Sequence, residues 1–126
     1  MKNIIWISSY PKSGNTMLRL FLSGYLFTKE GIIDDLKIAK AISKFNTQRV
    51  YKYLGNQLNI EKINFNTNLI SNHFINVQLK LYKNFPKNTF FFKTHNAFSN
   101  YNMQNFTNNK ITRDVIYIVR DPRDVL

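Results

Sequence analysis

The chain has 126 residues, of which 44% are apolar and 15% aromatic, enough for one hydrophobic core and too many for a disordered tail. It contains no cysteine, which excludes disulfides, thiolate metal sites and a cysteine nucleophile, and which agrees with a cytoplasmic location. Its 18 Lys and Arg against 7 Asp and Glu give a net charge of +11, which attracts polyanions. An AT-rich coding sequence, which favours Asn, Lys and Ile, would produce part of the same excess.

No apolar stretch is long enough to cross a membrane. The run Ile4–Ile7 is too short for the core of a signal peptide, which needs roughly 7 to 15 residues. The stretch Met17–Phe27 contains Arg19 and falls short of the roughly 20 residues of a membrane span. With only His73 and His95 available as imidazole ligands, a metal site is not expected either. We therefore expect a soluble protein without a metal.

The N-terminal segment predicts a strand, a tight loop and a helix. Residues 3–9 contain contiguous bulky apolar side chains, as in a strand that is buried on both faces of a parallel sheet. Pro11 and Gly14 end this strand. Apolar residues then recur at helical spacing between residues 16 and 28. They are Leu18, Phe21, Leu22, Tyr25 and Leu26.

Helices are predicted next at 33–45 and 71–82. The first follows Asp34 and Asp35, which suit the positive end of a helix dipole, and the second ends before Pro86. The segment 46–69 predicts only one short helix.

The last third predicts two more buried strands, at 90–95 and 115–119, separated by a polar, Asn-rich surface loop at 96–110. Asp121 is a suitable N-cap and Pro122 a suitable first residue for a helix that follows. This helix would begin at Pro122, one turn before the last residue, Leu126. We therefore expect residues 1–126 to be the N-terminal part of a single domain whose C-terminal part is missing.

These elements predict an α/β fold, a three-layer arrangement with a parallel sheet flanked by helices. The three predicted strands end at Ser9, at about His95 and at Arg120. Ligands of open parallel sheets bind in the crevice outside the carboxyl ends of the strands. The sequence therefore predicts that polar groups from three distant segments meet at one edge of the sheet.

The loop after the first strand has the composition of an anion-binding site. Lys12 is a cation, Gly14 permits close approach of the backbone, and Ser13 and Thr16 carry hydroxyls at the start of a helix. The ATPase loop, G-x-x-x-x-G-K-[ST], places its lysine after the second glycine, whereas Lys12 precedes Gly14. Taken alone, this segment could also be an ordinary turn.

Three segments together resemble the motifs of the PAPS-dependent sulfotransferases, especially soluble and bacterial-type members. Residues 9–16, Ser-Tyr-Pro-Lys-Ser-Gly-Asn-Thr, look like the 5'-phosphosulfate loop of that family. Residues 92–95, Phe-Lys-Thr-His, resemble the motif that ends in its catalytic histidine, and residues 119–125, Val-Arg-Asp-Pro-Arg-Asp-Val, resemble its 3'-phosphate-binding segment. The motifs stand in the family's order and span the chain from end to end.

The resemblance implies a P-loop nucleoside-triphosphate-hydrolase-like fold, incomplete here at its C-terminus. It also implies transfer of a sulfuryl group from 3'-phosphoadenosine 5'-phosphosulfate (PAPS) to a hydroxyl or amine of a small-molecule or carbohydrate acceptor, without a metal. Such a reaction depends on positioning and on electrostatic stabilisation of oxygen charge.

By the same resemblance, Lys12 would neutralise the bridging oxygen as the nucleotide phosphate departs, and Lys93 would add a second cation near the transferred group. His95 would act as the general base, and Arg120 would bind the 3'-phosphate through its guanidinium group. The 5'-phosphate would be bound by Ser13, Gly14, Asn15 and Thr16.

The sequence departs from the family pattern at the site of the base. Met17 stands where many members have a tryptophan that stacks on the adenine. The serine that also binds the 3'-phosphate lies eight residues beyond the arginine in the family, which is past Leu126 here. We therefore expect the donor site of residues 1–126 to be incomplete.

Other interpretations stay open at this stage. The net charge would also suit a basic nucleic-acid-binding protein, the strand-loop-helix would suit an ATP-type P-loop phosphotransferase, and a shortened gene would give an inactive product. His95 could simply be satisfied by backbone groups, and Arg120 could pair with Asp121 or Asp124. Arg19 and Arg123 are predicted to be surface or positioning charges, and His73 to be structural.

Overall fold

The computed structural model describes residues 2–47, 50–51, 70–96, 100–101 and 103–125. Their elements follow in the order β1 (Ile4–Ser9), α1 (Asn15–Phe27), the 3-10 helix η1 (Leu36–Ala41), α4 (Phe74–Asn84), β2 (Phe90–Thr94), β3 (Asn100–Tyr101), β4 (Gln104–Asn105), β5 (Thr112–Ile118) and the 3-10 helix η2 (Pro122–Asp124). None of the helices in these ranges is long and apolar enough to cross a membrane.

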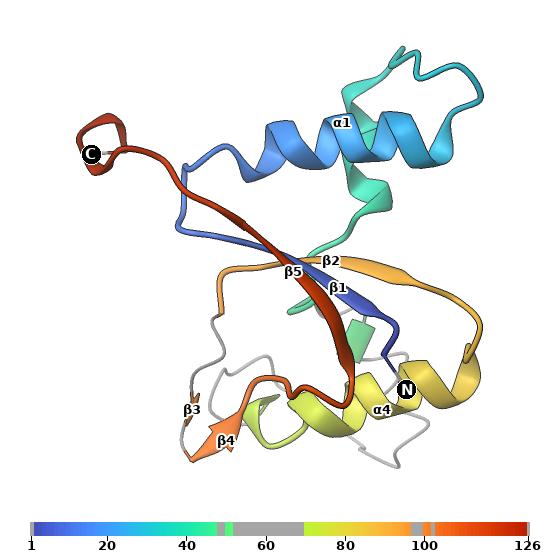
Figure 1. The fold of residues 1–126 in the computed structure, drawn as a ribbon, viewed down its shortest axis with the longest axis vertical. Coiled ribbons are helices and arrows are strands. Elements are labelled where there is room, and N and C mark those ends of the chain that lie inside the picture. The colour runs from blue at the N-terminus through green and yellow to red at the C-terminus, as the bar shows by residue number, and fades with distance from the viewer. Residues whose placement is uncertain (1, 48–49, 52–69, 97–99, 102, 126) are drawn as a thin grey trace.

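The centre of the fold is a three-stranded sheet in the order β2-β1-β5. Both pairings are parallel, with Ile4 opposite Phe90 on one side of β1 and Trp6 opposite Val115 on the other. The carboxyl ends of all three strands therefore lie at one edge of the sheet. Helices α1 and α4 lie on opposite sides of the sheet (Figure 1). The predicted parallel sheet with helices on both sides is present, which is consistent with an α/β fold.

The side of the sheet that faces α4 carries an aromatic core. Trp6 is 1% exposed, and its ring packs against those of Phe45 and Phe106 at centroid distances of 5.1 and 4.9 Å. Phe74 from α4 contacts Phe106, and Phe92 from β2 contacts Phe45. The apolar residues of the strands pack against the apolar face of α4, because burial of apolar surface is favourable.

A chain of hydrogen bonds runs through this core. The Trp6 Nε1–H donates to Thr112 Oγ1 at 3.0 Å, and the Thr112 and Thr107 hydroxyls are 2.8 Å apart. Thr107 Oγ1 donates to Gln78 Oε1 at 2.7 Å, and Gln78 Nε2 donates to the carbonyl of Phe106 at 2.7 Å. Because an amide oxygen only accepts, the single hydroxyl proton of Thr107 goes to Gln78. Thr112 must therefore donate to Thr107, and every member of the chain has a partner. The chain ties α4 to β1 and β5.

The side of α1 that packs inward is polar. Asn15, Arg19 and Ser23, spaced four apart, are buried, whereas Phe21 and Tyr25 are 60% and 81% exposed. The predicted helix is present, but its apolar stripe is not the face that packs against the protein. Arg19 explains the orientation, because its Nε and Nη2 donate to the carbonyls of Ile42 and Ala39 at 2.9 and 2.8 Å.

The helix predicted at 33–45 is wrong in type and length. Only the short 3-10 helix η1 forms, capped by Asp35, whose carboxylate accepts from the amide of Lys37 at 2.8 Å. The segment that follows is extended instead, because Lys93 N donates to the carbonyl of Ser43 and Phe45 N donates to that of Lys93. Lys44 and Lys93 are thereby paired in a parallel bridge along the free edge of β2.

The remaining predicted elements are partly as expected. The helix predicted at 71–82 and the strands at 90–95 and 115–119 are present as α4, β2 and β5. However, β5 is not buried: Val115 is 41% and Tyr117 is 62% exposed, because β5 is an edge strand whose outer face no described residue covers. The segment 96–110 is not simply a surface loop, since it contains β3, β4 and the buried Phe106. The short helix predicted within 46–69 falls almost entirely outside the described residues.

Candidate functional site

A cleft of about 520 Å3 lies at the carboxyl edge of the sheet. β1 has β2 on one side and β5 on the other, which is the kind of position where crevices of parallel sheets form. Every predicted site residue except Ser13 lines this cleft. These residues are Lys12, Gly14, Asn15, Thr16, Met17, Lys93, His95 and Arg120.

The loop between β1 and α1 has an unusual backbone. Lys12 has a φ of 62°, a left-handed conformation that few non-glycine residues adopt and that is often found at functional sites. Gly14 has a φ of 97°, and a Cβ built there would meet nothing within 4 Å, so the conformation rather than space requires glycine. Ser13, which is 6% exposed, donates its amide to the carbonyl of Tyr10 at 3.3 Å.

The N-terminus of α1 opens into the cleft. Its N-cap, Gly14, provides no side-chain hydrogen bond, and the first turn carries no acidic residue. The first amides of a helix lack partners within the helix and form the positive end of its dipole. They are therefore suited to bind an anion such as a phosphate or sulfate.

The side chain of Asn15 serves the fold. Its Nδ2 donates to the carbonyl of Ile7 at 3.2 Å and to Ser9 Oγ at 3.0 Å, which fastens α1 to the end of β1. Its Oδ1 is buried and has no partner among the described residues. Since an amide oxygen cannot donate to a phosphate, any contact of Asn15 with the predicted 5'-phosphate must come from its backbone N–H.

His95 is held across the edge of the sheet by β1. Its Nδ1 lies 2.7 Å from the carbonyl oxygen of Ser9. Because a carbonyl only accepts, Nδ1 must carry the proton, which leaves a lone pair on Nε2. The ring itself is exposed at the cleft. The backbone of β1 therefore fixes the tautomer of the imidazole.

Lys93 lies in a concentration of positive charge. Burial lowers the pKa of its ammonium group, and the charges of Lys44 and Arg19 lower this pKa further. Arg19 is 8% exposed, and burial also lowers the pKa of its guanidinium group. Within the described ranges no carboxylate pairs with any of these three residues, and no cluster of three potential metal ligands occurs.

Arg120 lies in the cleft without an acidic partner in the part of the chain that the structure describes. Asp121 caps η2 by accepting from the amide of Arg123 at 2.9 Å, and its carboxylate also binds the Arg123 guanidinium at 2.7 Å. These hydrogen bonds from Arg123 lower the pKa of the Asp121 carboxyl. The predicted capping by Asp121, with Pro122 at the start of the helix, is thus confirmed.

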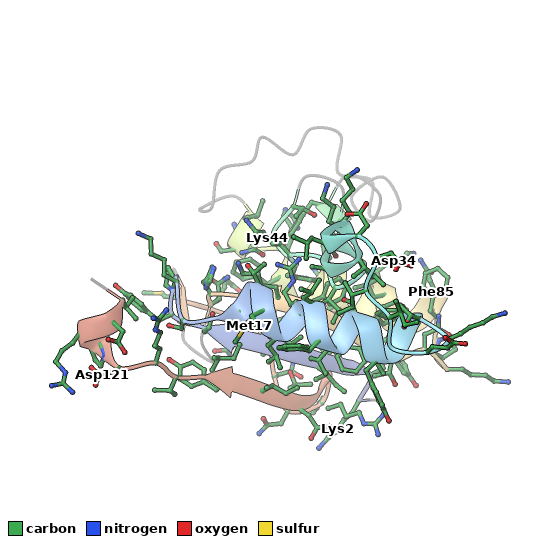
Figure 2. The ribbon with its side chains drawn as sticks, turned by 90° about the horizontal axis from the view of Figure 1, so that it is seen from above. Lys2, Met17, Asp34, Lys44, Phe85 and Asp121 are labelled. Carbon is green, nitrogen blue, oxygen red and sulfur yellow. The ribbon has the colours of Figure 1, made fainter. Side chains whose placement is uncertain are left out.

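Two residues near the site were not identified from the sequence. Arg19 was predicted to be a surface or positioning charge, but it is buried and fixes the segment 39–42; its position four residues after Asn15 was the only available signal. Lys44 lies beside Lys93 because of a bridge between distant segments, for which the sequence carries no local signal. Met17 is 62% exposed on the first turn of α1 (Figure 2).

Comparison with known families gives one clear match. The family model of the sulfotransferase domain matches residues 2–126. Comparisons with curated proteins and with solved structures gave no match. The family match covers almost every residue, including all three segments that converge on the cleft. The chain therefore belongs to the sulfotransferase domain family and is a transferase enzyme.

Proposed function

We propose that this protein transfers a sulfuryl group from PAPS to a hydroxyl or amine of a small-molecule or carbohydrate acceptor, on a three-layer fold of the P-loop type. One observation carries the proposal. Lys12, the N-terminus of α1, Lys93, His95 and Arg120 line a single cleft although they come from three distant segments.

The residues of the cleft fit a donor with negative charge at both ends. The volume of the cleft, about 520 Å3, is within the range of roughly 300 to 1,000 Å3 that is usual for small-molecule sites. Lys12 and the amides of α1 would hold the 5'-phosphosulfate, and the guanidinium group of Arg120 would bind the 3'-phosphate in bidentate fashion. Met17 offers an exposed, polarizable side chain to the base in place of an aromatic ring.

When bound, the donor supplies the sulfuryl group, whose bond to the nucleotide phosphate oxygen breaks as a bond to the acceptor oxygen or nitrogen forms. His95 takes the proton of the acceptor at Nε2, while the Ser9 carbonyl holds its Nδ1–H in place. Lys12 neutralises the charge that develops on the departing phosphate, and Lys93 stabilises the oxygens of the transferred group. The residues act by position and charge, and no step requires a metal.

The test compares Lys12→Ala with wild type, using labelled PAPS and a panel of alcohols, phenols and amino sugars. We expect the transfer rate to fall by at least about 100-fold, as when one preorganised charge-stabilising donor is removed from an active site. The control is Lys87→Ala, which removes an exposed lysine from the turn after α4, far from the lining of the cleft.

Binding of adenosine 3',5'-bisphosphate, followed by calorimetry, provides a second readout. Arg120→Ala should weaken it by about tenfold or more, the effect of losing a charge-assisted hydrogen bond. Absence of transfer to every acceptor, together with unchanged nucleotide binding in both variants, would contradict the proposal. Preferential binding of Mg-ATP would favour an ATP-type phosphotransferase instead.

A further inference from the structure

A second, smaller pocket adjoins the cleft at His95. It has a volume of about 110 Å3, and its walls are Lys44, Asn46, Lys93, Thr94, His95 and Asn96. Lys93 and His95 line both cavities, so the two spaces meet at the proposed base. Lys44, labelled in Figure 2, lines only the smaller pocket. A molecule in this pocket would lie next to the ring of His95.

The two lysines of this pocket are held side by side by the backbone. Lys93 N donates to the carbonyl of Ser43 at 2.9 Å and Phe45 N donates to that of Lys93 at 3.0 Å, which pairs Lys44 with Lys93 in parallel register. Side chains at paired positions share a face of the sheet. Because Phe45 and Phe92 point into the core on the α4 side, Lys44 and Lys93 point to the α1 side.

Two like charges opposite each other on neighbouring strands destabilise a sheet, and an anion bound between them would relieve this repulsion. The buried guanidinium of Arg19 adds a third positive charge nearby and bonds only to carbonyl oxygens. The salt bridges found within the described ranges lie elsewhere, at Asp35, Asp114 and Asp121. The described part of the protein does not supply the anion, and a ligand would.

The other polar groups of the pocket can also donate. The Oδ1 of Asn46 accepts from the hydroxyl of Tyr51 at 3.4 Å, and the amide nitrogen of the same side chain is a donor. The space of about 110 Å3 corresponds to roughly three or four water molecules at about 30 Å3 each, which is enough for an oxyanion and too small for a large apolar ring system.

A larger, apolar pocket is the alternative acceptor site. The pocket of about 250 Å3 near Trp6 and Tyr117 shares Thr94 and Asn96 with the smaller pocket, but it is almost entirely apolar and lies on the α4 side of the sheet. Neither Lys93 nor His95 lines it. A molecule bound there would contact neither the ammonium group of Lys93 nor the ring of His95. The cationic pocket is therefore the better acceptor subsite.

We propose that the pocket formed by Lys44, Asn46, Lys93 and His95 selects an acceptor that carries a carboxylate, phosphate or sulfate group beside the hydroxyl or amine that is sulfated. This inference rests on the proposed sulfuryl transfer. Lys44 is the specificity-determining residue, since it belongs to the acceptor side alone, whereas the donor has Lys12, Lys93 and Arg120.

The test uses three acceptors of one shape: D-glucose, D-glucuronate and D-glucose 6-phosphate. Wild type should show a kcat/KM at least about tenfold higher for one or both anionic sugars than for glucose, the size of one charge-assisted hydrogen bond. The two anionic sugars distinguish a carboxylate ligand from a phosphate. Lys44→Ala should lower kcat/KM for the anionic sugars at least about tenfold more than for glucose and so remove the preference. Lys44→Arg should keep the preference, and the Lys87→Ala control should behave as wild type.

Binding separates failure of this inference from failure of the proposed function. With adenosine 3',5'-bisphosphate bound, D-glucuronate should shift the NMR signals of the His95 ring in wild type and not in Lys44→Ala, while glucose should shift neither. Equal rates for the three sugars, a preference for an apolar phenol such as 2-naphthol, or no binding of either anionic sugar would overturn the inference. So would a Lys44→Ala variant whose defect is in nucleotide binding. The Lys12→Ala experiment would stand in each case.

Discussion

The two faces of the sheet carry different kinds of side chain. On the α4 side, Trp6, Phe45 and Phe92 pack ring against ring, and the one polar chain that crosses this core has a partner for each member. On the α1 side, the inward residues Asn15 and Arg19 are polar and are fixed to backbone carbonyls. The aromatic core therefore lies on one side of β1, and the cleft with its cations lies on the other.

This difference shows how a short α/β chain can hold a charged site. Cations destabilise an apolar core unless they are paired, so they are gathered on the side where α1 exposes its N-terminus and where solvent reaches the cleft. The aromatic side then has to hold the strands in register, because the positions of His95 and Arg120 depend on where β2 and β5 end. Substitutions on the two sides should therefore separate stability from activity.

The largest effect is expected on the aromatic side. Trp6→Ala should lower the free energy of unfolding by about 3 to 5 kcal/mol, because it removes a buried ring and leaves the hydroxyl of Thr112 without its donor. Urea unfolding followed by circular dichroism measures this loss. Trp6→Phe, which keeps most of the packing and loses only the hydrogen bond, should cost less than half as much. An equally small loss in both variants would show that this face does not carry the stability.

The opposite pattern is expected at His95. His95→Asn should lower kcat by about 100- to 10,000-fold, the usual contribution of a general base, because the amide cannot take up the proton of the acceptor. Its thermal midpoint should stay close to that of wild type, since the ring is exposed and makes one hydrogen bond to Ser9. Activity and stability that fall together would mean that His95 is a structural residue, and the base would have to be sought elsewhere.

The sequence predicted those features that depend on local signals. β1 and β2 were found from contiguous apolar residues, and the cleft was found because the motif residues stand where three strands end. These are local signals, and they held. The segment after η1 was mistaken for helix because its apolar spacing is helical, while the hydrogen bonds to Lys93 that make it extended come from a distant strand.

The same dependence on distant partners hid the edge position of β5 and the pairing of Lys44 with Lys93. A run such as 115–119 has the same composition whether its outer face is covered or open. The roles of Lys12, His95 and Arg120, the identity of the donor and the cytoplasmic location stay predictions, since they concern chemistry and context beyond the arrangement of the chain.

The smallest effect concerns the cost of placing cations on the α1 side. The pKa of Lys93 is lowered in the folded chain from its ordinary value of 10.5 by burial and then by Lys44 and Arg19. The unfolded chain therefore binds more protons between the lowered pKa and 10.5, so the contribution of Lys93 to stability rises with pH across this window and is unfavourable at neutral pH. Lys93→Met should accordingly raise the free energy of unfolding at pH 7 by about 0.2 to 1 kcal/mol, the usual cost of like charges on paired strands.

Urea unfolding at pH 7 and at pH 10 measures this gain, with the exposed Lys87→Met as the control for removal of any one lysine. The advantage of Lys93→Met over wild type should shrink at the higher pH, because the wild-type ammonium group then loses its proton, while sulfuryl transfer should fall at both values. A variant that is less stable than wild type at pH 7 would show that Lys93 is compensated within the folded protein. In that case the positive charge on the α1 side would need no bound anion to balance it. The two faces of the sheet would then differ in amino-acid composition alone.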